Sequence, residues 1–463
     1  MNATISSVQN SNAKKILIIT GDPIGKKLAG PAIRALNFAR ELSADQHSVR
    51  LMSLQSAELE LPGIDLVAVS TGSQMKAHEN WADIIIVQGN ALVLFPVLAK
   101  TKKYLVVDVY DPMHLEQLEQ ARGMRTSEWN ASILGANAIL NHQLRIGDFF
   151  LAASDRQLHF WLGALASLGR INSRTYLQDL SLKALIDVVP FGMESSLPSQ
   201  RKAVLRDVVP GIDQDSKLLI WAGGIYDWFD PETLVRAVDL VRHRRPQIKL
   251  FFMGTRHPHP GVPEMEIIAR TRQLSEQLEL TGTHVFFNDS WVDYEDRHNY
   301  LLEADAGVST HFEHIETVFS FRTRILDYLW AGLPIVSTRG DTFAELVDRH
   351  ELGATVAESD VVALAEAIEH VLFDTSAQTR MRENVAAIRS DFFWGSTTQA
   401  LRDFCADPHF AADRVDYSPK GEVIRAVPPS TGTVAFRRIR RGFAILFTQG
   451  PVQLFKKATK SSN

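Results

Sequence analysis

Short runs of consecutive apolar residues recur along this 463-residue chain, and helical patterns separate them. The first run lies in residues 15–20 (KILIIT), and further strands are expected at residues 49–54, 84–87, 105–107 and 149–152. A continuous apolar run is typical of a parallel strand that is buried on both faces of its sheet. Helices between such strands form the crossover connections. The alternation therefore predicts a doubly wound α/β sheet.

The alternation then starts again. Residues 187–192 close the first series, a polar stretch follows, and new strands are expected at 217–221, 249–253, 285–287 and 306–309. We expect a disordered leader (1–14), a Rossmann-like domain (15–193), a linker (194–215), a second Rossmann-like domain (216–388), a helix that crosses back (389–405) and a basic tail (406–463). Two such domains would face a cleft, where open α/β sheets bind their ligands.

Composition excludes several classes of protein. A content of 45% hydrophobic and 22% charged residues is ordinary for a globular protein, and a net charge of −5 does not favour nucleic acid. The single cysteine, Cys405, excludes an intrachain disulfide and suits a reducing compartment. No apolar run reaches bilayer length, and the polar start lacks a signal-peptide core. We expect a cytoplasmic protein.

Residues 316–336 contain a polar turn, a short amphipathic helix, a Gly-Leu-Pro stop and a β-branched strand. A helix entrance favours anions, and Arg322 and Arg324 would add charge-assisted phosphate contacts there. Asp327, one turn further on, could accept hydrogen bonds from sugar hydroxyls. The alternative is an Arg/Asp pair that forms only a surface ion pair.

This segment resembles the donor site of GT-B glycosyltransferases, in particular the retaining family 4 of bacterial glycan synthesis. The family form is Glu-x7-Glu followed by Ala-x-x-x-Gly-x-Pro. Here Glu316 and Asp327 are eleven residues apart, and the second acid is aspartate. The resemblance implies transfer of a hexose, with retention, from a nucleoside-diphosphate sugar to a glycan or lipid-linked acceptor, without a metal or other cofactor. It implies that Glu316, Arg322, Arg324 and Asp327 bind the donor, and that both arginines act in catalysis.

Two loops of the first half are further candidates. In the loop after the first strand, Gly30 and Arg34 are expected to help bind the donor, although the loop could simply reverse the chain. The loop 107–114 follows another strand, and in it Asp111 and His114, beside Asp108, are candidates for sugar contact or proton transfer. The alternative for Asp111 is a helix-capping turn.

The second half lacks a feature that the family usually carries. After the strand 217–221, Gly223 and Gly224 allow close backbone approach, but the arginine and lysine of the usual Gly-Arg-x-x-x-x-Lys are missing. The diphosphate would then depend on Arg322 and Arg324. Trp291 is a candidate for contact with the donor base, with core packing as its alternative.

The end of the chain is basic. Residues 434–460 contain seven Lys or Arg and no acid, so the rest carries −5 − 7 = −12. A basic amphipathic segment on an acidic body indicates attraction to anionic lipid, at the inner face of the membrane. The alternatives are a nucleic-acid tail, which the acidic body disfavours, and an ordinary packing helix.

Two other functions stay open. One is another GT-B enzyme, such as a sugar-nucleotide epimerase. The other is a non-catalytic scaffold in a polysaccharide assembly complex, which the missing Arg/Lys pair suggests.

Overall fold

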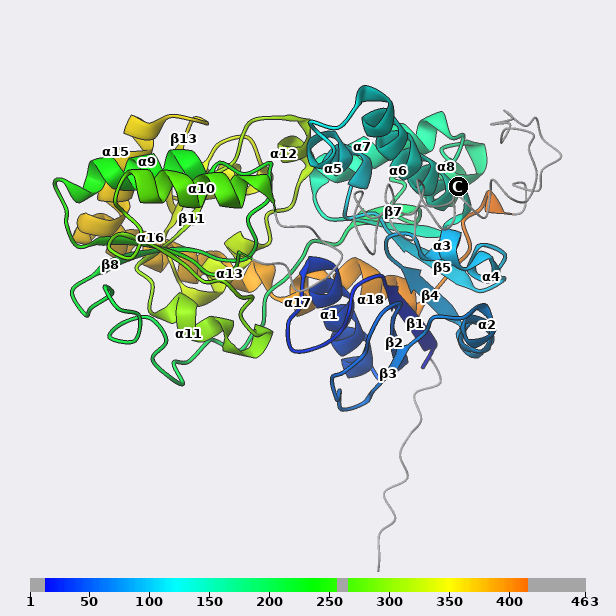
Figure 1. Cartoon of the computed structure of the whole chain (residues 1–463). Helices are drawn as coiled ribbons and strands as arrows, with labels where there is room; N and C mark the ends of the chain where they lie inside the picture. Colours follow the sequence, from blue (N-terminus) through cyan, green and yellow to red (C-terminus); the bar gives the residue numbers. More distant parts are fainter. Residues whose placement is uncertain (1–12, 256–264, 415–463) are drawn as a thin grey trace, which may run out of the picture.

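Two α/β domains make up the computed structural model, which describes residues 13–255 and 265–414. The N-terminal domain is blue to teal in Figure 1, and the second domain is green to gold. Each is built on one parallel sheet, of seven and six strands respectively. This confirms the predicted fold class of two Rossmann-like domains.

The first sheet has the strand order β3-β2-β1-β4-β5-β6-β7. Its central strands are buried at every position from Ile16 to Thr20 and from Ile84 to Val87, as their continuous apolar runs predict. The strands are β1 (Lys15–Thr20), β2 (Ser48–Ser53), β3 (Ile64–Ala68), β4 (Ile84–Val87), β5 (Tyr104–Asp108), β6 (Phe149–Ala152) and β7 (Ile186–Val188).

The second sheet has the order β10-β9-β8-β11-β12-β13. Helices α9, α10 and α15 cover one face (Figure 1), while α11 and α13 pack on the other. The strands are β8 (Lys217–Trp221), β9 (Ile248–Phe252), β10 (Val285–Phe287), β11 (Ala306–Ser309), β12 (Ile335–Thr338) and β13 (Gly353–Val356).

The helices follow the crossovers. In the first domain they are α1 (Gly30–Ala44), α2 (Gly72–Trp81), α3 (Ala91–Leu94), α4 (Pro96–Ala99), α5 (Met113–Gln120), α6 (Thr126–Ile146), α7 (Asp155–Ser167) and α8 (Ser173–Gln178). In the second they are α9 (Pro231–Arg242), α10 (Glu266–Gln277), η1 (Tyr294–Asp296), α11 (Arg297–Leu302), α12 (Ile315–Phe319), α13 (Arg324–Ala331), α14 (Thr342–Arg349), α15 (Val361–Phe373) and α16 (Thr375–Ile388).

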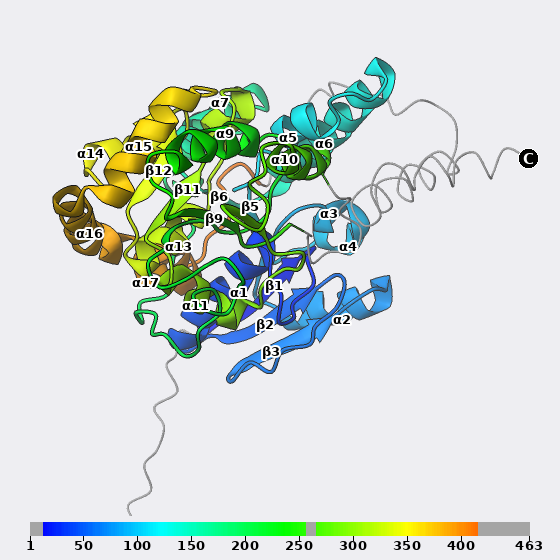
Figure 2. The ribbon, with the colours of Figure 1, turned by 60° about the vertical axis from the view of Figure 1, so that its left-hand side comes forward.

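After α16 the chain returns to the first domain through η2 (Arg389–Phe392), α17 (Trp394–Thr397) and α18 (Gln399–Ala406). Helix α17 lies beside α1 in both views (Figures 1 and 2). Gly192 is needed at this crossing, because a Cβ there would lie 2.8 Å from the Trp394 Cα. Residues 407–414 continue along the first domain, where Arg170 pairs with Asp413 at 2.8 Å.

Two strands do not have the pattern that the sequence analysis used. Strands β3 and β13 lie at sheet edges, and most of their residues are only partly buried. An edge strand has fewer buried neighbours, so it lacks the continuous apolar run of a central strand. The predicted membrane-binding segment, 434–460, lies outside the described residues.

Candidate active site

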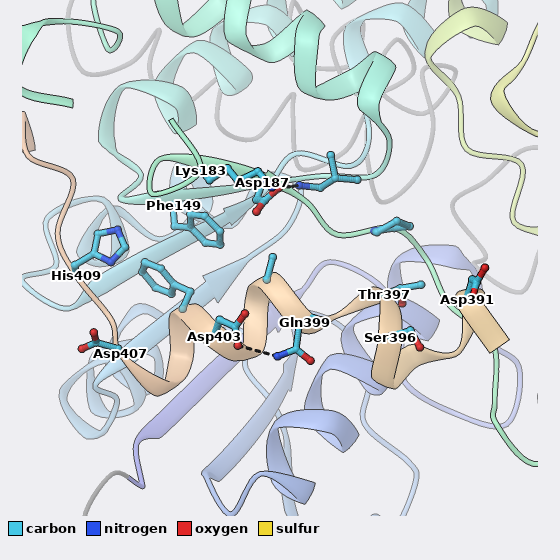
Figure 3. A pocket seen from close by; sticks show the side chains of 14 residues that line it. Phe149, Lys183, Asp187, Asp391, Ser396, Thr397, Gln399, Asp403, Asp407 and His409 are labelled. Atoms are coloured by element: carbon cyan, nitrogen blue, oxygen red, sulfur yellow. Dashed lines mark hydrogen bonds between the residues drawn. The ribbon is translucent and has the colours of Figure 1, made fainter. Parts of the chain in front are cut away.

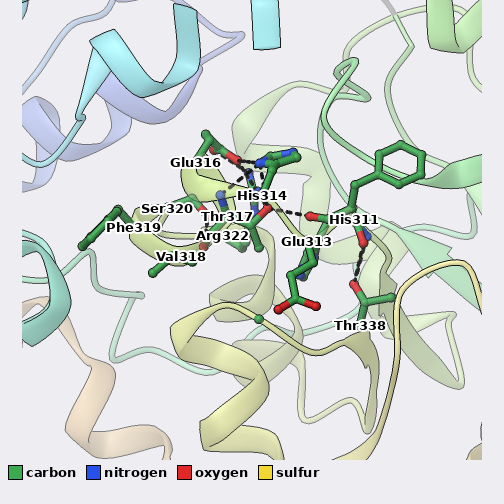
Figure 4. Close-up of polar contacts among 12 residues, drawn as sticks. His311, Glu313, His314, Glu316, Thr317, Val318, Phe319, Ser320, Arg322 and Thr338 are labelled. Atoms are coloured by element: carbon green, nitrogen blue, oxygen red, sulfur yellow. Dashed lines mark hydrogen bonds and ion pairs between the residues drawn. The ribbon is translucent and has the colours of Figure 1, made fainter. Parts of the chain in front are cut away.

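The segment predicted to bind the donor begins beyond the carboxyl end of β11, and its charged residues lie on α12 and near the start of α13. The side chains of Glu316 and Arg322 face each other there (Figure 4), and two N–H groups of Arg322 donate to the carboxylate at 2.7 and 3.1 Å. Both residues are buried. Arg322 is therefore already neutralised by Glu316, and only its Nε makes no hydrogen bond to any described residue.

Arg324 reaches the loop that follows β8. Its Nη2 donates to the Gly224 carbonyl at 2.7 Å, and its guanidinium lies over the rings of Trp221 and Phe229 at 4.4 and 4.2 Å. Burial lowers the pKa of Arg324 to about 10, so it stays charged at neutral pH. Its Nη1 is buried and has no hydrogen-bond partner among the residues described. A buried cation with an unused donor can bind an anion.

The glycine loop beside Arg324 is tightly packed. Gly223 has a φ of +84°, which favours glycine. A Cβ on Gly224 would lie 3.1 Å from Tyr226 and 3.2 Å from Trp291. The Trp291 indole also donates to the Leu28 carbonyl of the first domain at 3.3 Å. The structure thus brings Gly223, Gly224, Trp291 and Arg324 together.

Asp327 lies beside a cation that the sequence analysis did not consider. Arg297 Nε donates to its carboxylate at 3.2 Å, and another Arg297 nitrogen is 3.4 Å from Glu194. The Arg297 guanidinium is enclosed by the rings of Tyr294 and Trp330. Burial raises the pKa of Asp327, and Arg297 opposes that shift. One charge partner thus fixes the orientation of the carboxylate.

The first domain contributes carboxylates to the same place, because α5 contacts α12. Burial, together with the nearby charges of Glu316 and Asp108, raises the pKa of Asp111 to about 7. Burial also raises the pKa of Glu116 well above its ordinary value, with contributions from Asp111 and Glu316. Glu116 was missed in the sequence analysis, although its place one turn into the helix after Asp111 could have indicated it.

His114 is on the same helix but is packed among aromatic rings. Its ring stacks on Phe160 at 5.6 Å, and burial lowers its pKa to about 4. At neutral pH the imidazole is therefore uncharged, and it can act as a proton acceptor but not as a cation.

Arg34 is fully buried in the first domain. It makes two hydrogen bonds to Asp108, at 2.7 and 2.9 Å, and a third to the Val189 carbonyl at 2.8 Å. Neither charged side chain of this pair is exposed. Arg34 thus pairs inside the first domain, although its Nη1, like that of Arg324, is buried and makes no hydrogen bond to a described residue. Its contact with the donor stays a prediction. Gly30 begins α1, and a Cβ there would meet nothing within 4 Å, so packing does not require glycine.

A separate hollow of about 720 Å³ lies on the first domain (Figure 3). Its lining comes from the β6 and β7 region and from the returning C-terminal helices, and includes Phe149, Asp187 and Asp403. None of the predicted site residues lines it. In the described part of the chain, no cluster of three or more His, Cys, Asp or Glu is arranged to hold a metal, and no helix has the length and apolarity to cross a membrane.

A comparison with protein-family models matches the second domain, which contains Arg324 and the glycine loop. Residues 216–374 match the family model described as "Glycosyl transferases group 1". No curated protein sequence matches the chain.

Solved structures match over most of the length. They include sucrose-phosphate synthase from Thermosynechococcus elongatus (TM-score 0.60, 16% identity, 84% of this chain and 97% of that one). They also include WaaG, a glycosyltransferase involved in lipopolysaccharide biosynthesis (TM-score 0.58, 15% identity, 84% of this chain and 99% of that one). Alr3699/HepE of Anabaena in complex with UDP-glucose matches with a TM-score of 0.58 and 15% identity, over 84% of this chain and 98% of that one. At these identities the likeness concerns the fold. The chain thus has the GT-B fold, and its second domain matches the glycosyl transferase group 1 model.

Proposed function

We propose that this protein is a glycosyltransferase that moves a hexose from a nucleoside-diphosphate sugar to a glycan or lipid-linked acceptor, with retention of configuration. The group 1 match and the GT-B fold support this class of reaction. The observation that carries the proposal is Arg324, a buried cation with an unused donor beside a glycine loop. It supplies positive charge to the loop after β8, whose own sequence has none.

In the proposed reaction, the bond from the sugar to the diphosphate breaks and a bond to an acceptor oxygen forms. Arg324 and the helix entrance of α13 would stabilise the negative charge that develops on the leaving diphosphate. Asp327, oriented by Arg297, would accept hydrogen bonds from the ribose hydroxyls of the donor. Asp111 has a pKa about 7, which suits proton exchange with an acceptor hydroxyl.

Other expected features remain proposals. We propose that the reaction needs no metal, because guanidinium and backbone N–H groups can carry the diphosphate charge. Contacts of the donor with Gly30, Trp291 or Glu316 are part of the same proposal. So is peripheral binding of the protein to the inner face of a membrane.

The test is calorimetric titration of the full-length chain with a panel that includes UDP-glucose and GDP-mannose. A transferase should bind at least one donor, and Arg324→Met should weaken that binding about tenfold or more, the value of one charge-assisted hydrogen bond. Arg382→Met is the matched control. Its guanidinium also donates to backbone carbonyls, those of Gly332 and Asp305, at the opposite end of α13.

The same panel separates the alternatives. An epimerase would convert the bound sugar without an acceptor, and a scaffold would bind no donor. Either result would contradict the proposed transfer reaction.

A further inference from the structure

The short helix that carries Glu316 is capped by the other domain. Helix α12 has five residues and ends at Phe319, so its last carbonyls lack partners within the helix. Gln157 Nε2, on α7 of the first domain, donates to the Phe319 carbonyl at 2.7 Å. Arg156 Nη1 donates to the Val318 carbonyl at 3.2 Å. Two neighbouring residues of α7 thus each cap one carbonyl at the end of α12.

Gln157 is itself held in a fixed orientation. It is fully buried, its Oε1 accepts from the Ala153 amide at 2.9 Å, and its Nε2 also donates to the Tyr110 carbonyl at 2.8 Å. The side-chain amide therefore joins the loop after β5 directly to the end of α12. In an apolar, buried position each of these bonds is costly to lose.

Arg156 extends the same junction to the loop after β12. The nitrogen that contacts Val318 also donates to the Gly340 carbonyl at 2.7 Å, and another pairs with Glu345 at the start of α14. Phe160, one turn further along α7, packs on Phe319 with ring centroids 4.7 Å apart.

We propose that Arg156 and Gln157 form an interdomain latch that positions the donor segment, residues 316–324. Glu316 and Arg322 lie on either side of the capped carbonyls, so fixing Val318 and Phe319 fixes the backbone that carries both side chains. When the domains separate, α12 loses both caps. Donor affinity is then coupled to the closed arrangement of the domains, since a ligand binds only the competent fraction.

This inference rests on the proposed function for its ligand, but its geometry does not. Arg156 and Gln157 are positioning residues, which act through α12 and need not touch the donor. The interdomain contact of Trp291 with Leu28 lies on a different loop and does not cap α12.

The test uses the full-length protein with Gln157→Met, which keeps the side-chain volume and removes the amide. Gln143→Met is the matched control, because Gln143 is also buried and donates to a backbone carbonyl, that of Gly89, within the first domain alone. Hydrogen exchange of the amides of residues 315–324 is measured with no ligand, and donor Kd is measured with UDP-glucose and GDP-mannose.

The latch predicts that Gln157→Met speeds exchange in 315–324 and raises donor Kd about tenfold, while kcat at saturating donor changes less than KM. Gln143→Met should change neither exchange in that segment nor donor Kd. Arg156→Ala, in a side chain that is partly exposed, should act in the same direction if Gln157→Met fails to fold.

Equal exchange of residues 315–324 in the wild type and in the latch variants would overturn the proposal. So would equal effects of Gln157→Met and Gln143→Met. If the wild type binds no nucleoside-diphosphate sugar, the proposed function fails, and the exchange measurement alone decides the latch.

Discussion

Replacing Arg34 by methionine should destabilise the first domain. The change leaves the Asp108 carboxylate buried, with Gln88 Nε2 at 3.0 Å as a remaining donor. Removing one partner of a buried ion pair costs about 3–5 kcal/mol. For a domain of this size, each kcal/mol lowers Tm by about 2–4 °C, so the expected loss is about 6–20 °C.

The assay is scanning calorimetry of Arg34→Met and of the double variant Arg34→Met/Asp108→Leu. The double variant removes both charges, so it should melt above the single variant, because an apolar pair of similar volume can replace a buried ion pair. Donor Kd, measured below the transition, tests the predicted donor contact of Arg34 separately, and a Kd equal to that of the wild type would exclude that contact. The reasoning is refuted if Arg34→Met has the same Tm as the wild type, or if the double variant melts below Arg34→Met.

Three further predictions follow from the site. Burial raises the pKa of Asp111 from 3.8 to about 7, so between these pH values the folded state holds a proton that the unfolded state releases, and stability falls as pH rises. Asp111→Asn has no such proton, so the Tm of the variant minus that of the wild type should increase from pH 5 to pH 8. A Tm difference that stays constant over this range would contradict the prediction. Asp327→Asn should raise donor Kd about tenfold, with a smaller effect for a deoxyribose donor; calorimetry with both donors tests this, and equal effects would exclude a ribose contact. Deleting residues 434–463 should abolish sedimentation with anionic vesicles, while retained sedimentation would exclude that segment as the membrane contact.

The central strands were predictable because their environment is uniform. Residues 16–20 and 84–87 are buried at every position, which leaves nearly unbroken apolar runs in the sequence. The edge strand 64–68 mixes exposed and half-buried positions, so it has no such run. The fold class follows from the central strands, and edges do not alter it.

The site was predictable in its elements more than in its contacts. The pattern of residues 316–336 indicated the helix entrance and its two arginines, but it could not show that Arg322 pairs with the Glu316 carboxylate while Arg324 donates to a backbone carbonyl. Those partners depend on how α13 lies against the loop after β8. Likewise, Arg34 and Asp108 are 74 positions apart, and only the folded sheet brings them together. Arg297 carried no local signal, because its carboxylate partner is 30 positions away.

The central claim is that Arg324 and the glycine loop hold the diphosphate of a sugar donor. Titration of wild type, Arg324→Met and Arg382→Met with a nucleoside-diphosphate sugar panel tests it most directly. The account predicts that a donor binds to the wild type and to Arg382→Met, and binds Arg324→Met about tenfold or more weakly. Equal donor affinity in the wild type and Arg324→Met, or no donor bound by the wild type, would contradict it.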